Sequence, residues 1–281
     1  MNGMRLGLLV LVALVWPGQV AFAQQQGSKI HMHAAEGYAA DGFLFTPQGQ
    51  GPFPAVLLIH DAEGLSDYVR AAAQRLAAQG NLVVAIDLYR GRSGSTAQET
   101  QQLANDLSDA DAMHDLGAAL AFLRSLPNVR AGALGVAGWG TGSRYAMQLA
   151  GDATSLRAIA ITAPDAADLK LAVQCKIAFM GSFTGDVPSA QVRSLEAGLG
   201  KGGRLLDIKV YPQAHGRFYD PRAVDYRAQD SADVIDRLVR LFGTALDSQH
   251  PSAAQLWLSP TESMAECCNG APVTAENTFS E

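Results

Sequence analysis

The chain has 281 residues, of which 48% are hydrophobic and 17% are charged, and its formal net charge at pH 7 is -6. This length and composition suffice for one large domain with a substantial apolar core. The negative charge and the lack of any basic run argue against nucleic acid as a partner. No segment reaches the roughly 18 consecutive apolar residues that a membrane span requires.

The first 23 residues have the pattern of a signal peptide. Arg5 supplies a positive charge, Leu6 to Trp16 form a short apolar core, and Ala21-Phe22-Ala23 is a small-x-small cleavage site before Gln24. An uncleaved anchor is the alternative interpretation. The sequence therefore predicts an exported protein, periplasmic or secreted, with a short N-terminal segment over residues 24–28.

Residues 29–243 alternate between strand-like and helix-like patterns, which predicts one domain with a mostly parallel sheet covered on both faces. We expect a leading antiparallel pair joined through Glu36-Gly37, and a long helical segment with a break near Ser108. The tail, residues 244–281, is polar and irregular and is predicted to be disordered. The expected strands are 29–34, 42–46, 54–60, 82–87, 133–137, 157–162, 176–181 and 206–211, and the expected helices are 65–79, 97–126, 144–150, 191–199 and 224–242.

A glycine-rich turn separates the apolar strand at 133–137 from the helix that follows it. Gly138 and Gly142 flank the turn with the spacing of a nucleophile elbow, Gly-x-Nu-x-Gly, in which a Ser, Cys or Asp occupies the middle position. Here that position is Gly140, which has no side chain to attack a substrate. The segment predicts the fold and at the same time lacks the nucleophile on which its usual chemistry depends.

In parallel sheets, ligands bind at the carboxyl ends of the strands, so the residues that follow each strand are the candidates for chemistry. Besides the elbow, three such segments carry polar side chains. They are His-Asp-Ala-Glu-Gly at 60–64, Asp-Leu-Tyr-Arg-Gly at 87–91 and Tyr-Pro-Gln-Ala-His-Gly-Arg-Phe at 211–218.

In their order and spacing, these motifs resemble the dienelactone hydrolase family over about residues 29–242. The resemblance implies an α/β-hydrolase fold and the hydrolysis of small esters or lactones, with no cofactor. It also implies a catalytic Cys in the elbow, a His base in the late loop, an Asp that orients this His, and a Glu after the first buried strand that interacts with the resting Cys.

Two of the four catalytic positions implied by the resemblance carry the expected residue: His215 matches the base and Glu63 matches the glutamate. Gly140 occupies the position of the nucleophile. Thr184 stands where the resemblance places the aspartate, and Asp186 follows closely. Two roles are open for Asp186: a cap for the helix that begins near Pro188, which the pattern favours, or a partner of His215.

Four further residues are expected to bind substrate. Trp139 and Thr141 flank the elbow apex and should line the pocket, while Arg90 and Arg217 are candidates to hold an anionic substrate. No metal site is expected, because His31-x-His33 alone is weak support for zinc.

No other residue is well placed to replace the nucleophile. Thr141 should point away from the substrate carbonyl, Ser143 is typical of a first helical turn, and Cys175 precedes an apolar strand as a small buried residue does. Cys267 and Cys268 are adjacent to each other, and whether either of them forms a disulfide with Cys175 is not decided by the sequence. Two hypotheses remain: a hydrolase of small esters or lactones without the usual covalent step, and a non-catalytic protein that binds a small ligand or a partner.

Overall fold

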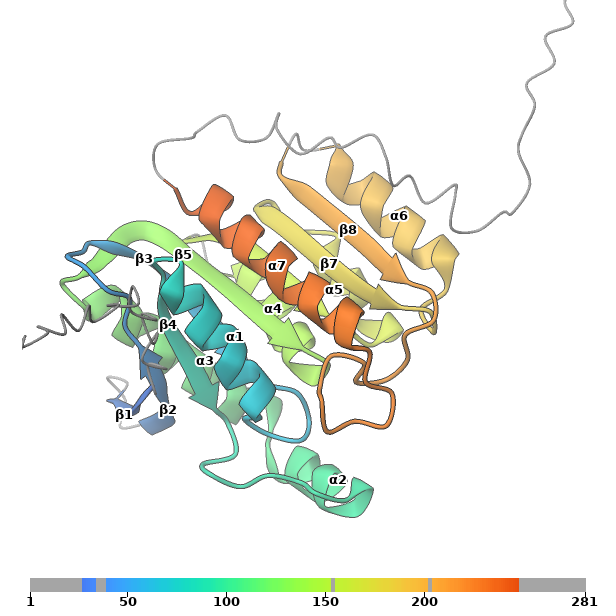
Figure 1. The fold of residues 1–281 in the computed structure, drawn as a ribbon, viewed down its shortest axis with the longest axis horizontal. Helices are drawn as coiled ribbons and strands as arrows, with labels where there is room; N and C mark the ends of the chain where they lie inside the picture. The colour runs from blue at the N-terminus through green and yellow to red at the C-terminus, as the bar shows by residue number, and fades with distance from the viewer. Residues whose placement is uncertain (1–26, 34–38, 153–154, 202–203, 248–281) are drawn as a thin grey trace, which may run out of the picture.

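The computed structural model describes residues 27–33, 39–152, 155–201 and 204–247. Within them, eight strands form one sheet in the order β1-β2-β4-β3-β5-β6-β7-β8 (Figure 1). The strands are β1 (Ser28–His33), β2 (Ala39–Phe45), β3 (Phe53–Ile59), β4 (Leu82–Asp87), β5 (Val129–Trp139), β6 (Leu156–Thr162), β7 (Ala178–Thr184) and β8 (Leu206–Tyr211). The helices are α1 (Asp67–Ala78), α2 (Ala97–Asp106), α3 (Asp109–Ser125), α4 (Thr141–Asp152), α5 (Leu169–Ala172), α6 (Ser189–Gly200) and α7 (Ala228–Ala245), with a 3-10 turn η1 (Ala166–Asp168) before α5.

The sheet is parallel from β4 across to β8, and β1 and β2 form an antiparallel extension at one edge. In the centre, Leu57 of β3 lies opposite Val84 of β4 and Val136 of β5. This arrangement is the predicted α/β-hydrolase fold, and it confirms the leading antiparallel pair. It places the carboxyl ends of β3 to β8 along the same end of the sheet, where ligands bind in such folds.

Helices cover both faces of the sheet, as Figure 1 shows for α1 and α7 on the near face and α3 and α4 behind it. Alternate residues along each strand therefore enter two separate cores. Leu58 of β3 belongs to the core under α1 and α7, whereas its neighbour Leu57 belongs to the core under α3 and α4. Because both faces are buried, the strands carry near-continuous apolar runs.

The structure divides the helical segment predicted over residues 97–126 into α2 and α3. Ser108 begins α3 by accepting a hydrogen bond from the N–H of Asp111, so the predicted break is confirmed. The α2 helix begins with a capping box in which the Thr96 hydroxyl and the Glu99 carboxylate each bind the backbone of the other. The sequence pattern did not predict η1 and α5, whose few residues are too short for a recognisable period.

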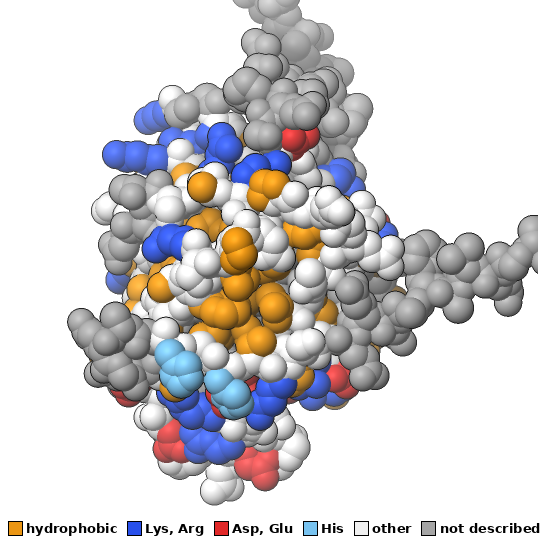
Figure 2. All heavy atoms as spheres, turned by 90° about the vertical axis from the view of Figure 1, so that its left-hand side faces the viewer, with side chains coloured by type: hydrophobic (Ala, Val, Ile, Leu, Met, Phe, Trp, Pro, Cys, Tyr) orange, Lys and Arg blue, Asp and Glu red, His pale blue; other side chains and the backbone are white. Residues whose placement is uncertain are grey.

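Several predicted features lie outside the described residues: the signal peptide, the Glu36-Gly37 connection, Cys267 and Cys268, and all of the tail beyond residue 247. The last helix, α7, ends at Ala245, slightly later than expected. Among the described residues, no helix is both long enough and apolar enough to span a membrane. Figure 2 shows that the side of the molecule near β1 and β2 carries a group of hydrophobic side chains bordered by His and charged side chains.

Candidate active site

The elbow predicted from the glycine spacing is present between β5 and α4. Gly140 forms its apex with a φ of 50°, in the left-handed region. A Cβ atom on Gly138 would lie 2.1 Å from the carbonyl oxygen of Gly142, and one on Gly142 would lie 2.4 Å from the carbonyl oxygen of His60. Both neighbours are backbone atoms that cannot move aside. Glycine is therefore required at both flanking positions by packing, whatever residue stands at the apex.

The space beside the apex is bounded by two polar side chains from distant parts of the chain. A Cβ atom on Gly140 would lie 3.2 Å from Cβ of Asp61 and 3.6 Å from the hydroxyl oxygen of Tyr219. Asp61 follows β3, and Tyr219 belongs to the loop between β8 and α7. A side chain at position 140 would thus begin in contact with the Asp61 side chain.

Asp61 is the residue that sequence reasoning missed. The residue is 5% exposed, and both of its carboxylate oxygens accept hydrogen bonds. Oδ1 accepts from the backbone N–H of Glu63 at 3.0 Å, and Oδ2 accepts from the Tyr219 hydroxyl at 2.8 Å. The sequence did contain an indication of its position. Asp61 comes almost directly after the buried strand that ends at Ile59, so it must lie at the carboxyl ends of the strands.

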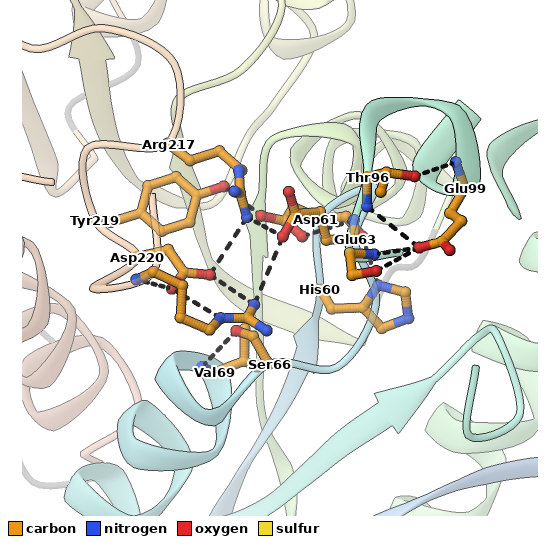
Figure 3. Close-up of polar contacts among 12 residues, drawn as sticks. His60, Asp61, Glu63, Ser66, Val69, Thr96, Glu99, Arg217, Tyr219 and Asp220 are labelled. Carbon is orange, nitrogen blue, oxygen red and sulfur yellow. Dashed lines mark hydrogen bonds and ion pairs between the residues drawn. The ribbon is translucent and has the colours of Figure 1, made fainter. Parts of the chain in front are cut away.

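Glu63, which the resemblance favoured as a catalytic residue, lies in an ion-pair cluster (Figure 3). Its carboxylate pairs with Arg217 and lies 3.7 Å from Arg222. The same two arginines hold Asp220, at 3.4 Å from Arg217 and 2.8 Å from Arg222. Arg217, predicted to hold an anionic substrate, is therefore already neutralised by two carboxylates of the protein.

Asp220 is the buried centre of this cluster, with its side chain 1% exposed. Burial alone would raise the pKa of Asp220, but hydrogen bonds from the Arg222 side chain and backbone, together with the charge of Arg217, hold that pKa below its ordinary value. The cluster ties the loop between β8 and α7 to the turn after β3.

Arg90, the second arginine expected to hold substrate, points elsewhere. Its guanidinium lies 3.1 Å from the buried carboxylate of Asp115 on α3 and donates a hydrogen bond to the carbonyl oxygen of Ala39 on β2. The backbone of Arg90 has a φ of 54°, in the left-handed region. The contacts of Arg90 are those of a residue that joins α3 to the sheet.

His215 and Asp186 form a pair, as one of the two roles open to Asp186 requires. Nδ1 of His215 lies 2.6 Å from Oδ1 of Asp186, and both side chains are more than half exposed, at 58% and 57%. The helix-cap role favoured by the sequence pattern is wrong, because the cap position of α6 is Pro188 and no side chain caps that helix. The pair joins the loop after β7 to the loop after β8.

A cavity of about 80 Å³ lies at the carboxyl ends of the strands, beside the elbow. Its lining includes Thr141 but neither Trp139 nor His215. Trp139 is 1% exposed and packs edge-on against Tyr68, with ring centroids 6.0 Å apart, so it belongs to the core under α1 and α7. The lining residues are His60, Asp61, Leu88, Tyr89, Ala104, Leu107, Asp109, Thr141, Arg144 and Tyr145.

His60 lines this cavity but is not available as a base. Its Nε2 accepts a hydrogen bond from the N–H of Leu88 at 3.1 Å, so the proton of the neutral ring is on Nδ1, which donates to the carbonyl oxygen of Asp61 at 2.7 Å. Burial lowers the pKa of His60 below its ordinary value. Both ring nitrogens are occupied, and the ring is a fixed part of the wall.

The arginine in the cavity wall is also paired. Both terminal nitrogens of Arg144 donate to Asp109, at 2.7 and 2.8 Å, and the Tyr145 hydroxyl donates to the same carboxylate at 3.1 Å. Burial raises the pKa of Tyr145 to about 12, which keeps this phenol protonated near neutral pH. The pairing leaves the α4 side of the cavity without an uncompensated charge.

Among the described residues, no group of three or more His, Cys, Asp or Glu side chains is placed to hold a metal ion. His31, considered for zinc, instead lies 2.6 Å from Asp41 on the neighbouring strand.

A model of the dienelactone hydrolase family matches residues 40–246. The chain belongs to the dienelactone hydrolase family. It is 28% identical over 227 residues to a Synechocystis protein named "Putative carboxymethylenebutenolidase", covering 73% of this chain and 92% of that protein. A Methylorubrum extorquens protein of the same name is 29% identical, over 71% of this chain and 76% of its own length.

Solved structures show the same fold at lower sequence identity. A dienelactone hydrolase of Anabaena variabilis is 18% identical with a TM-score of 0.58, over 78% of this chain and 97% of that one. A dienelactone hydrolase-like promiscuous phosphotriesterase from metagenomic libraries is 20% identical with a TM-score of 0.64, over 77% and 96%. These likenesses support the α/β-hydrolase fold of the sheet and elbow.

Two of the three possible substitutes for the nucleophile in this dienelactone hydrolase family member are buried. Ser143 is fully buried, and its hydroxyl lies 2.8 Å from the carbonyl oxygen of Gly138 and 3.1 Å from that of Thr162. Cys175 is 3% exposed, and burial raises the pKa of its thiol, which disfavours the reactive thiolate. Thr141 is exposed and lines the cavity.

Proposed function

We propose that this protein hydrolyses small esters or lactones by direct attack of water, without an acyl-enzyme intermediate. One observation carries the proposal. The elbow keeps its geometry around an apex that has no side chain, while His215 and Asp186 keep a contact of 2.6 Å. The elbow and the histidine oriented by Asp186 are the two parts of a hydrolytic site that this protein keeps.

Each of the remaining groups has a role in this proposed reaction. Thr141 begins α4, and the N–H groups of a first helical turn have no partner within the helix, so they can stabilise the oxyanion that forms when water attacks a carbonyl carbon. His215, oriented by Asp186 and open to solvent, moves a proton to or from the reacting oxygens. Loss of the nucleophile from a triad leaves a rate enhancement of about 10³–10⁴ over water, and we expect activity of that order.

Mass spectrometry during turnover tests the proposal. The mature protein is mixed with a short activated ester, quenched in acid and measured as the intact chain. Direct attack by water predicts turnover with no acyl adduct at any time. An adduct that accumulates and then decays would overturn the direct mechanism, and peptide mapping would identify the side chain that carries it.

A second candidate function is binding without catalysis. Two observations favour it: His215 is not among the residues that line the cavity, and the cavity volume of about 80 Å³ is small for a ligand site, since such pockets usually measure about 300–1,000 Å³. Calorimetric binding of short esters or lactones, with no product formed during hours of incubation, would establish this function in place of hydrolysis.

We also propose that the protein is exported, on the basis of its N-terminal pattern alone. Cleavage after Ala23 would give a mature chain that begins at Gln24. N-terminal sequencing of protein recovered from outside the cytoplasm tests this. Protein found only inside cells with its first residues intact would contradict it.

A further inference from the structure

We propose that the Asp61 carboxylate holds the attacking water beside Gly140 and accepts its proton. The inference rests on the proposed hydrolase function and assigns the base for the attack, a role that neither the sequence pattern nor the resemblance gave to this residue.

The position of Asp61 is the first argument. Its Cβ lies 3.2 Å from the point where a side chain on Gly140 would begin, and Asp61 also lines the cavity. A nucleophile's side chain would occupy this place in a typical elbow. With glycine at the apex no side chain takes this place, and we assign it to the attacking water, next to the Tyr219 hydroxyl 3.6 Å from the same point and the carboxylate that this hydroxyl binds.

The hydrogen bonds of Asp61 are the second argument. Each carboxylate oxygen has about two acceptor sites, and each accepts one hydrogen bond from the described protein, Oδ1 from Glu63 and Oδ2 from Tyr219. One site therefore remains on each oxygen. The two donors come from different elements and fix the orientation of the carboxylate, which is how a positioned base gains efficiency.

The other groups near the cavity have basic atoms that are already engaged. Nε2 of His60 accepts from Leu88, and the second lining carboxylate, Asp109, is held by both terminal nitrogens of Arg144. Glu63 is paired with Arg217. The two hydrogen-bond donors of Asp61 are, in contrast, an uncharged amide and an uncharged phenol.

The proposed hydrolysis has an addition step and an elimination step. A bond forms between the water oxygen and the carbonyl carbon while one water proton passes to Asp61. The tetrahedral intermediate then breaks its bond to the leaving oxygen, which takes a proton from protonated His215. The proton on Asp61 returns through solvent to His215, which is exposed enough to exchange it. The products are the carboxylic acid and the alcohol, and both side chains are restored.

Asp61→Asn is the variant that separates basicity from structure. The amide oxygen of asparagine can accept the hydrogen bond from Glu63, and its NH₂ can donate to the Tyr219 oxygen, so both contacts survive while the proton acceptor is lost. The matched control is Asp165→Asn. Asp165 accepts from the N–H of Ala167 at 2.9 Å in the same kind of turn after β6, and it is exposed and outside the cavity lining.

We expect kcat/KM for a short activated ester to fall by about 100-fold or more in Asp61→Asn, the contribution typical of a general base. The melting temperature should stay close to that of the wild type, and Asp165→Asn should hydrolyse at the wild-type rate. Asp61→Ala should also be inactive, and added formate or azide should restore part of its activity, whereas equal chloride should not. A purely structural role for Asp61 predicts no such rescue.

The outcomes separate the two proposals. An active wild type with an equally active Asp61→Asn would overturn the role of Asp61 and leave the hydrolase function standing. An active wild type whose Asp61→Ala variant is inactive and not rescued by formate or azide would overturn it too. A wild type that hydrolyses no ester or lactone would overturn the function itself, and the role of Asp61 with it.

Discussion

The hydroxyl of Tyr219 donates a hydrogen bond of 2.8 Å to the Asp61 carboxylate, and both residues are almost fully buried. Residues 158 positions apart in the chain are thereby joined beside the elbow apex. The bond places the loop between β8 and α7, which also carries His215, against the turn after β3. The bond thus joins the segments that follow β3 and β8 at the carboxyl ends of the strands.

Removal of this bond should cost stability. Tyr219→Phe deletes the donor and leaves the buried Oδ2 of Asp61 without its partner, and hydrogen bonds to charged groups contribute about 1.5–3 kcal/mol. We expect the free energy of unfolding, measured with urea, to fall by about that amount. Tyr226→Phe is the control, because Tyr226 is 39% exposed in the same loop. Equal stability of the two variants would show that the Tyr219 bond does not hold the loop.

The flanking glycines of the elbow should tolerate no side chain. In Gly142→Ala the new Cβ would lie 2.4 Å from a backbone oxygen, and we expect a loss of about 3 kcal/mol or more, as for severe overpacking. Gly151→Ala is the matched control, since it lies in the same helix with nothing within 4 Å of its Cβ. It should gain about 0.5–1 kcal/mol, because alanine favours helix over glycine. Thermal unfolding of both variants is the measurement. A Gly142→Ala variant as stable as the wild type would contradict this account.

A cysteine introduced at the apex would show how the negative charge of the Asp61 carboxylate affects a thiol at residue 140. In Gly140→Cys the Cβ would contact Asp61 at 3.2 Å, and the left-handed backbone adds about 1–2 kcal/mol of cost. A nearby carboxylate disfavours the thiolate, so the new thiol should be alkylated by iodoacetamide more slowly than in the Gly140→Cys, Asp61→Asn double variant. Quantifying the peptide that contains residue 140 excludes the native cysteines. Equal rates in both would place Asp61 away from the apex.

His60 should make stability depend on pH. Its folded-state pKa is lowered from 6.5 by burial, so the unfolded chain takes up the proton first as the pH falls. The contribution of His60 to the free energy of unfolding is therefore complete above pH 6.5 and is lost as the pH falls below that value. The free energy of unfolding should fall by up to about 1.4 kcal/mol per pH unit. Urea unfolding between pH 8 and pH 5 should show a smaller loss in His60→Gln. An identical loss in the variant would assign the effect to other groups.

The sequence predicted the fold and the elbow well because both follow from local constraints. Gly138 and Gly142 have a spacing that only a tight strand-to-helix turn requires, and the structure shows the backbone contacts that explain it. The strands were visible because burial on both faces produces continuous apolar runs. The Ser108 break was visible because a cap residue has a local signature.

The arrangement of the site was harder to predict because it depends on contacts between distant segments. Nothing near Glu63 in the sequence shows that Arg217 will neutralise it, and the local pattern near Asp186 indicated a helix cap before the fold brought His215 to it. Asp61 was overlooked because matching a motif selected the glutamate of the turn. The position of a carboxylate relative to the apex is set by the packing of β3 against β5.

Hydrolysis of a panel of short activated esters and lactones by the mature protein, beside its His215→Ala variant, tests the central claim most directly. We predict activity well above the uncatalysed rate in the wild type and a marked loss in the variant, whose stability should change by less than about 1 kcal/mol because the pair with Asp186 is exposed. No activity in the wild type, or equal activity in both proteins, would contradict the claim and favour a protein that binds its ligand without transforming it.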